Sequence, residues 1–181
     1  DALRAAIPKE QDSAFVQLAW FPVKAAANYN RLQIATGRNR LWAGQGRIAA
    51  NAQADLVKTL FARDAELTRL HDALNGGKWR HMMDQTHIGY TSWQQPAQNI
   101  KPATHTLAAA AGWGVAVEGG GEAPPALARW GANRRWIDVF SKGAPIAVTA
   151  VSDAPWLTVA TGPAIASGDV LLEVSADWRQ A

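Results

Sequence analysis

The sequence predicts an α+β fold in two segregated parts: an antiparallel helical hairpin or bundle, followed by an incomplete antiparallel β-sandwich. Apolar residues recur every three or four positions between residues 11 and 75, which is typical of amphipathic helices. Short alternating segments separated by turn residues dominate after residue 105, which is typical of strands.

The first helical segment is expected to begin near residue 11, with Asp12 or Ser13 as its N-terminal cap. Pro22 interrupts the apolar pattern, so we expect a kink or a new helix start there. Beyond Pro22 one apolar stripe continues along the helix, and we expect this stripe to face the core. Its members are Val23, Ala27, Ile34 and Leu41.

The second helix is the most regular element of the sequence, and Gly44 and Gly46 predict the turn before it. Asn75, Gly76 and Gly77 predict its end. Two long helices joined by a short turn form a hairpin, which needs a further partner from residues 1–9 or from another domain. The apolar positions of this helix are Ile48, Ala52, Leu56, Leu60, Leu67, Leu70 and Leu74.

The strand pattern begins at residues 113–117. Residues 134–159 predict three short strands separated by turns at 142–143 and 153–155, and residues 170–174 predict another. Several short strands at regular spacing favour a β-sandwich. We therefore expect a helical domain over 1–76, an irregular Trp- and Gln-rich connector over 77–106, and a sandwich domain over 107–181 that is truncated at its C-terminus.

Composition excludes several classes of protein. The net charge is +3, and the 18 Lys and Arg are scattered, so no basic stripe predicts nucleic-acid binding. No apolar run approaches the roughly 20 residues of a membrane helix, so we expect no membrane partner. The absence of cysteine excludes disulfides and thiolate chemistry. Nine Trp are many for 181 residues, although a given Trp is more often packed inside than displayed to a sugar.

The motifs that could carry chemistry are weak. His81-x-x-Asp84-x-x-His87 has metal-ligand atoms, but its spacing suits neither one helix face nor a strand, so we expect structural histidines and no metal or cofactor. The acidic residues of the second helix are interpreted as part of a solvent-exposed face. No pair of carboxylates in the sequence predicts glycoside hydrolysis. Gly119–Gly121 lacks the strand and helix of a phosphate loop. We expect Arg134 and Arg135 at a solvated strand edge.

Residues 76–96 carry a longer pattern, G-K-W-x-H-M-M-D-Q-T-H-I-G-Y-x-x-W-Q-Q-P, which resembles glycoside hydrolase family 115, the xylan α-1,2-glucuronidases. Upstream, FVQLAWFPVKAAANYN and LFARDAELTRLHDALNGGKW look like the helical domain of that family. Downstream, GWGVAVEG, RRWIDVFSKGAPI and DAPWLTV look like the start of its C-terminal β-sandwich. The resemblance covers nearly the whole chain and departs slightly at Lys101-Pro102, where an apolar residue is expected before the proline.

The resemblance implies that the chain is part of a secreted or periplasmic enzyme that removes glucuronic acid, or its 4-O-methyl ether, from xylan. In this family the catalytic acids lie in a (β/α)8 barrel, none of whose positions is present in this sequence. The implied partners are that barrel and, through the parent enzyme, a xylan-derived oligosaccharide. We therefore expect no catalytic residues here and no activity of this chain alone.

The connector is interpreted mainly as an interdomain clamp, with contact to the glycan as the other role. Aromatic and amide side chains suit both, because they wedge between domains and also line oligosaccharide sites. Two alternatives for the whole chain stay open, a carbohydrate-binding module that uses Trp130, Trp136 and Trp156, and a dimerisation scaffold built on the hairpin. The connector residues with either role are Trp79, His87, Tyr90, Trp93, Gln94 and Gln95.

Overall fold

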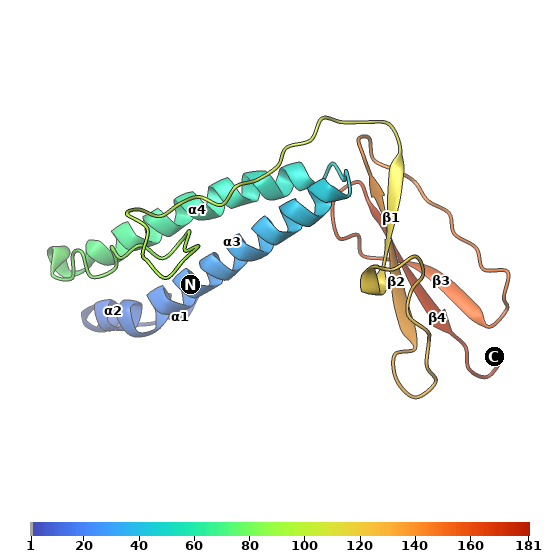
Figure 1. Cartoon of the computed structure of the whole chain (residues 1–181). Helices are drawn as coiled ribbons and strands as arrows, with labels where there is room; N and C mark the ends of the chain where they lie inside the picture. The colour runs from blue at the N-terminus through green and yellow to red at the C-terminus, as the bar shows by residue number, and fades with distance from the viewer. Residues whose placement is uncertain (1) are drawn as a thin grey trace. The chain divides into compact units, whose positions relative to one another are not determined.

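The computed structural model describes residues 2–181 (Figure 1). It confirms the predicted α+β class, because the α-helices lie before residue 73 and a four-stranded antiparallel sheet follows residue 112. The chain folds into two compact units. The first comprises the residues up to Arg40 together with Ala52–His105, and the second comprises Leu41–Asn51 together with Thr106–Ala181.

The N-terminal segment contains α1 (Ala2–Ala5), α2 (Lys9–Phe15) and a π-helical turn over Val16–Trp20. This turn is the interruption predicted at Pro22: the Phe21 N–H donates to the carbonyl of Val16, five residues back. Proline has no N–H, and its ring displaces the carbonyl four residues earlier, so the turn before Pro22 widens.

The predicted N-terminal cap is wrong. Helix α2 follows Pro8, and no side chain caps it. Asp12 lies inside α2 and accepts hydrogen bonds from the Arg4 guanidinium at 2.7 and 2.8 Å. The Ser13 hydroxyl accepts a hydrogen bond from the Asn75 amide at 2.8 Å. Both side chains are therefore used in tertiary contacts, which the local capping pattern does not reveal.

The predicted hairpin is formed by α3 (Phe21–Gly44) and α4 (Ala50–Asp72), which run antiparallel (Figure 1). Gly46, in the turn between them, has φ +69°, a conformation that glycine adopts without strain. A 3₁₀ turn over Leu74–Gly77 follows α4, and Asn75 and Gly76 in it have left-handed backbones. The turn and the helix stop are thus where glycine and asparagine predicted them.

The predicted buried stripe of α3 is wrong. Val23, Ile34 and Leu41 are 66%, 55% and 60% exposed, and Ala27 is exposed as well. The physical reason is that α3 carries two apolar stripes on roughly opposite sides of the helix, and the stripe that holds Phe21, Leu32 and Trp42 lies inside. The buried positions are Phe21, Asn28, Leu32, Ala35, Asn39 and Trp42.

Two asparagines are tolerated on the buried face of α3 because their amides are satisfied. The Asn28 side chain donates to the Leu60 carbonyl at 2.9 Å. The Asn39 side chain donates to the carbonyl of His105 and accepts from its N–H, at 2.9 and 2.8 Å. The first unit packs two apolar clusters: the larger consists of Leu32, Ala35, Val57, Leu60 and Ile88, and the smaller consists of Val16, Phe21 and Leu67.

The sheet of the second unit has the strand order β1-β2-β4-β3, with every neighbouring pair antiparallel. Val115, Val139 and Val170 lie opposite one another across three strands, and Trp136 and Glu173 lie on the other face. The strands are β1 (Trp113–Val117), β2 (Arg134–Ser141), β3 (Leu157–Gly162) and β4 (Val170–Ala176).

One predicted strand does not form. Residues 144–151 are irregular, although 134–141 and 157–162 on either side of them are strands. Pro145 cannot donate a ladder hydrogen bond. The next residue, Ile146, donates to the Gly168 carbonyl at 3.2 Å, and the Ala144 carbonyl accepts a hydrogen bond from the Ser141 hydroxyl. Most residues of the segment are exposed, including Val151 at 86%, so the apolar alternation there marks neither a strand nor a buried face.

No helix within residues 2–181 combines the length and the apolar character that a membrane-spanning segment requires.

Candidate functional site

The connector after α4 is anchored in the first unit by Ile88, which is completely buried in the apolar core between α3 and α4. The Asn99 side-chain oxygen accepts hydrogen bonds from the N–H groups of His87 and Ile88, at 2.8 and 3.0 Å. The Ile100 N–H donates to the carbonyl of Ile88 at 3.1 Å, and the Thr86 hydroxyl donates to the carbonyl of Pro96 at 2.8 Å. These bonds join the two ends of the loop formed by residues 89–96, which we call the connector loop.

Gly89 allows the two ends of the connector loop to approach closely. A Cβ on Gly89 would lie 2.6 Å from the Cβ of Ile100, and the backbone of Gly89 has φ +95°. Any other residue would therefore be strained both by its conformation and by the contact. The glycine is what lets residues 88 and 100 pair while the chain turns outward.

The tip of the connector loop exposes the aromatic and amide side chains that the sequence analysis singled out. Trp93 is 98% exposed and Tyr90 is 46% exposed. Gln94 and Gln95 are exposed, and the Gln95 side chain accepts a long hydrogen bond from Gln85 at 3.5 Å. Residues 88–100 contain no charged side chain, so the tip offers rings, amides and hydroxyls to a neutral partner.

His87 does not lie at the tip; its ring is held beside the base of the connector loop. Its Nε2 lies 2.9 Å from an Asp64 carboxylate oxygen, and its Nδ1 lies 2.9 Å from the carbonyl of Gln85. The Asp64 side chain is buried and belongs to α4. Desolvation alone would lower the pKa of His87, but the hydrogen bonds to Asp64 and Gln85, with the Asp64 charge, outweigh it and raise the pKa.

Trp79 is half-buried near the end of the helical turn, with the Lys78 ammonium 4.8 Å from its ring centroid. Its indole Nε1 has no hydrogen-bond partner among residues 2–181. The structure thus separates the six predicted residues into three groups: Trp79 is partly packed, His87 is paired with Asp64, and Tyr90, Trp93, Gln94 and Gln95 lie together at the tip.

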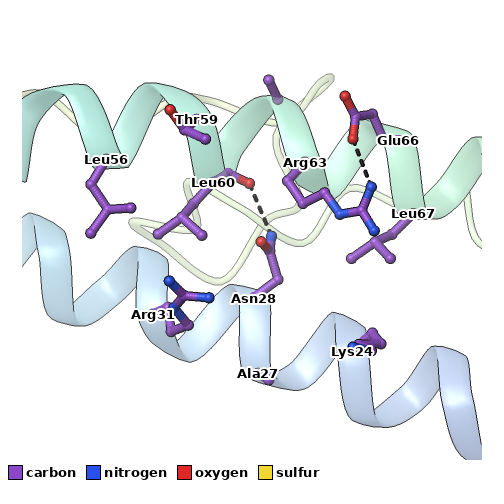
Figure 2. A pocket seen from close by; sticks show the side chains of 11 residues that line it. Lys24, Ala27, Asn28, Arg31, Leu56, Thr59, Leu60, Arg63, Glu66 and Leu67 are labelled. Carbon is purple, nitrogen blue, oxygen red and sulfur yellow. Dashed lines mark hydrogen bonds and ion pairs between the residues drawn. The ribbon is translucent and has the colours of Figure 1, made fainter. Parts of the chain in front are cut away.

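A groove of about 670 Å³ lies between α3 and α4 in the first unit (Figure 2). Lys24 and Arg31 line it from α3, and Arg63 and Glu66 line it from α4. Arg63 and Glu66 form an ion pair at 2.8 Å, and the Asn28 amide crosses the floor of the groove to Leu60, as the dashed lines show. The groove therefore carries a net positive charge.

The exposed stripe of α3 adjoins this groove, because Ala27 belongs to both. Val23 and Ile34 extend the stripe along the helix in steps of about one or two turns. Leu18, in the π-helical turn before α3, is 84% exposed. The outward side of α3 therefore exposes large apolar side chains beside a cationic groove.

A buried ion cluster in the second unit was not predicted. The Arg47 guanidinium, 1% exposed, pairs with the carboxylates of Asp138 and Asp169, which are both buried. The guanidinium carbon also lies 4.3 Å from the Trp42 ring centroid and 5.4 Å from that of Phe140. Burial raises the pKa of Asp138, and the Asp169 charge adds to this, against the lowering effect of Arg47.

This cluster is structural and not a catalytic site, because its charges are enclosed and occupied with one another. The two acids needed for glycoside hydrolysis would have to face each other across an open space. Within residues 2–181 most carboxylates are occupied by ion pairs or hydrogen bonds, some with neighbouring residues and some with distant ones. Those with a cationic or hydrogen-bonding partner include Asp12, Asp55, Asp64, Glu66, Asp84, Glu118, Asp138, Asp169 and Asp177.

Comparison with models of known protein families finds no match, and no curated protein is significantly similar to the chain.

Proposed function

We propose that this chain is a supporting, non-catalytic part of a glycoside hydrolase that resembles the family 115 xylan α-1,2-glucuronidases. The observation that carries the proposal is the outward face of α3, where Val23 and Ile34 are more than half exposed beside a positively charged groove. Exposed apolar side chains rimmed by charged residues often mark a site where another protein binds, which supports this role. The sequence resemblance of residues 76–96 supplies the identity of the partner, a (β/α)8 catalytic barrel.

The face suits a protein partner with an apolar centre and an acidic rim. Lys24, Arg31 and Arg63 outnumber Glu66 along the groove, so a negatively charged partner surface is favoured electrostatically. The apolar stripe would supply most of the binding free energy through burial of its side chains.

Binding of this chain to the isolated barrel portion of a family 115 enzyme tests the proposal. We expect saturable binding and no release of glucuronic acid from an aldouronic oligosaccharide by this chain alone. Val23→Asp combined with Ile34→Asp should abolish binding, whereas Leu70→Asp, at an exposed leucine of α4, should leave it unchanged. Release of glucuronic acid by the chain alone would contradict the non-catalytic role, and equal loss in both variants would contradict the docking face.

The connector loop favours a second function, direct contact with the neutral xylan backbone. Trp93 and Tyr90 project from a loop whose ends are fixed by hydrogen bonds, so little conformational entropy is lost when they bind. An aromatic ring with amides and hydroxyls beside it is what oligosaccharide sites use.

Titration with xylohexaose distinguishes this function from support alone. We expect the Trp fluorescence to change saturably in the wild type and to stay unchanged in Trp93→Ala. Trp130→Ala is the control, because it removes another exposed Trp (90%), and its fluorescence should change as in the wild type. No change in the wild type would remove the glycan contact and leave the docking proposal intact. Sedimentation of the free chain tests the dimerisation alternative. If the chain forms dimers and the Val23→Asp and Ile34→Asp substitutions disrupt them, the partner on the α3 face is a second copy of the chain.

A further inference from the structure

We propose that Asp72, His81 and Asp84 form a binding site for a divalent transition-metal ion such as Zn²⁺. The three side chains each offer one ligand atom, and these atoms all lie within 4.8 Å of one another. All three residues belong to the first unit. The site is separate from the docking face of α3 and does not depend on the proposed function.

The chain brings these residues together by reversing direction after α4. Asp72 is the last residue of α4, and the left-handed residues Asn75 and Gly76 turn the chain back. The N–H of His81 then donates to the Asp72 carboxylate at 3.2 Å, which fixes the spacing between the two residues. The pairing of Asp72 with a residue nine positions later is a consequence of this turn.

The third ligand comes from the next turn of the chain. The Nδ1 of His81 is hydrogen-bonded to a carboxylate oxygen of Asp84, so the imidazole already points toward that acid. Around a tetrahedral Zn²⁺ with bonds of about 2.0–2.1 Å, ligand atoms lie about 3.3 Å apart. Because the side chains of His81 and Asp84 are 73% and 46% exposed, small rotations are enough to separate this pair and admit an ion.

The donor set defines the class of ion. One imidazole nitrogen and two carboxylate oxygens suit Zn²⁺, Co²⁺ or Ni²⁺, whereas Mg²⁺ and Ca²⁺ prefer oxygen ligands alone. Two carboxylates balance the charge of a divalent ion. Three protein ligands on an exposed turn leave coordination positions open to water.

The chain contains a matched histidine–aspartate pair that lacks the third ligand. His87 and Asp64 are also in contact, at 2.9 Å, but the other ring nitrogen of His87 is occupied by the carbonyl of Gln85. Within residues 2–181 the three-ligand grouping contains His81 and not His87. A metal ion should therefore bind at His81 and Asp84, which have Asp72 as a third ligand, and not at His87 and Asp64.

Calorimetric titration of the untagged chain with ZnCl₂ tests the site, and the absorption of bound Co²⁺ provides a second readout. We expect one ion per chain in the wild type and in His87→Ala, and a loss of affinity of more than about tenfold in His81→Ala, Asp84→Asn and Asp72→Asn. Circular dichroism spectra identical to that of the wild type would show that each variant is folded.

Paramagnetic broadening by Co²⁺ in the unaltered chain gives a test that needs no substitution. The imidazole signals of His81 should broaden at substoichiometric Co²⁺, and those of His87 and His105 should not. Two results would overturn the proposal: no saturable binding to the wild type at millimolar ZnCl₂, or binding to His81→Ala with wild-type affinity.

Discussion

Arg47 and Asp138 form an ion pair in which both side chains are almost completely enclosed, at 1% and 3% exposure. Asp169 completes the cluster, with a carboxylate oxygen 2.6 Å from the second guanidinium nitrogen of Arg47. Trp42 and Phe140 cover the guanidinium within cation–π distance. Two carboxylates around one guanidinium leave a net negative charge inside the second unit, so the cluster depends on Arg47 more than on either acid.

Replacing Arg47 with Met should destabilise the second unit by about 3–5 kcal/mol, because two buried carboxylates lose their counter-charge. Urea unfolding measured by near-ultraviolet circular dichroism would give this difference. Arg63→Met is the matched control, since Arg63 is 43% exposed in its pair with Glu66, and its effect should stay within about 0.5 kcal/mol. If the two variants lost similar free energies of unfolding, burial of the Arg47 cluster would make no larger contribution to stability than an exposed ion pair.

The two acids of the cluster should not be equivalent. Asp169 accepts hydrogen bonds from Arg47 and from the Ser141 N–H at 2.8 Å, so Asp169→Asn removes charge from a well-bonded carboxylate. One oxygen of Asp138 has no hydrogen-bond partner among residues 2–181, and burial already raises the pKa of this group. We therefore expect Asp138→Asn to destabilise the unit less than Asp169→Asn, by roughly 1 kcal/mol or more. The reverse order in urea unfolding would contradict this assignment.

Helix α4 and its end could be predicted from the sequence, whereas the face that α3 buries could not. In α4 the predicted positions Leu60 and Leu67 are buried, although Ala52 and Leu70 of the same predicted set are exposed. In α3 both sides carry large apolar residues, Val23 and Ile34 on the exposed side and Trp42 on the buried side, so the apolar pattern does not determine which face is buried. The inner side depends on asparagine side chains that bond distant backbone groups, and periodicity carries no information about such partners.

The same contrast holds for the candidate sites: features that depend on nearby residues could be predicted, and features that depend on distant residues could not. The Trp- and Gln-rich connector could be predicted because its composition is local. The Arg47 cluster could not, because the acids that pair with Arg47 are 91 and 122 positions away in the chain. His81 and Asp84 suggest a grouping with His87, which is close in sequence, whereas Asp72, which joins them in space, belongs to the preceding helix.

Gly89→Ala should loosen the connector loop by about 1–3 kcal/mol, because the new Cβ meets Ile100 and the backbone keeps a positive φ. Faster hydrogen exchange at the Ile100 N–H would report this. Gly37→Ala is the matched control: it lies inside α3 with no atom within 4 Å of the added Cβ, and it should stabilise the helix by about 0.5–1 kcal/mol. Unchanged exchange at Ile100 in Gly89→Ala would mean that the loop ends are not held by this close approach.

The attachment of the connector to α4 should weaken as the pH rises. The pKa of His87 is raised in the folded chain, so the charged imidazole binds Asp64 and the carbonyl of Gln85 more strongly than the neutral ring does. The contribution to stability is then fully present below the unfolded pKa of about 6.5 and is lost as the pH rises through the higher folded value. An NMR titration of the His87 ring gives the folded pKa directly. The stability difference between the wild type and His87→Gln should shrink from pH 5.5 to pH 8.5, and Asp64→Asn should return the His87 pKa toward or below its ordinary value. A difference that grows with pH would contradict the pairing of a charged His87 with Asp64.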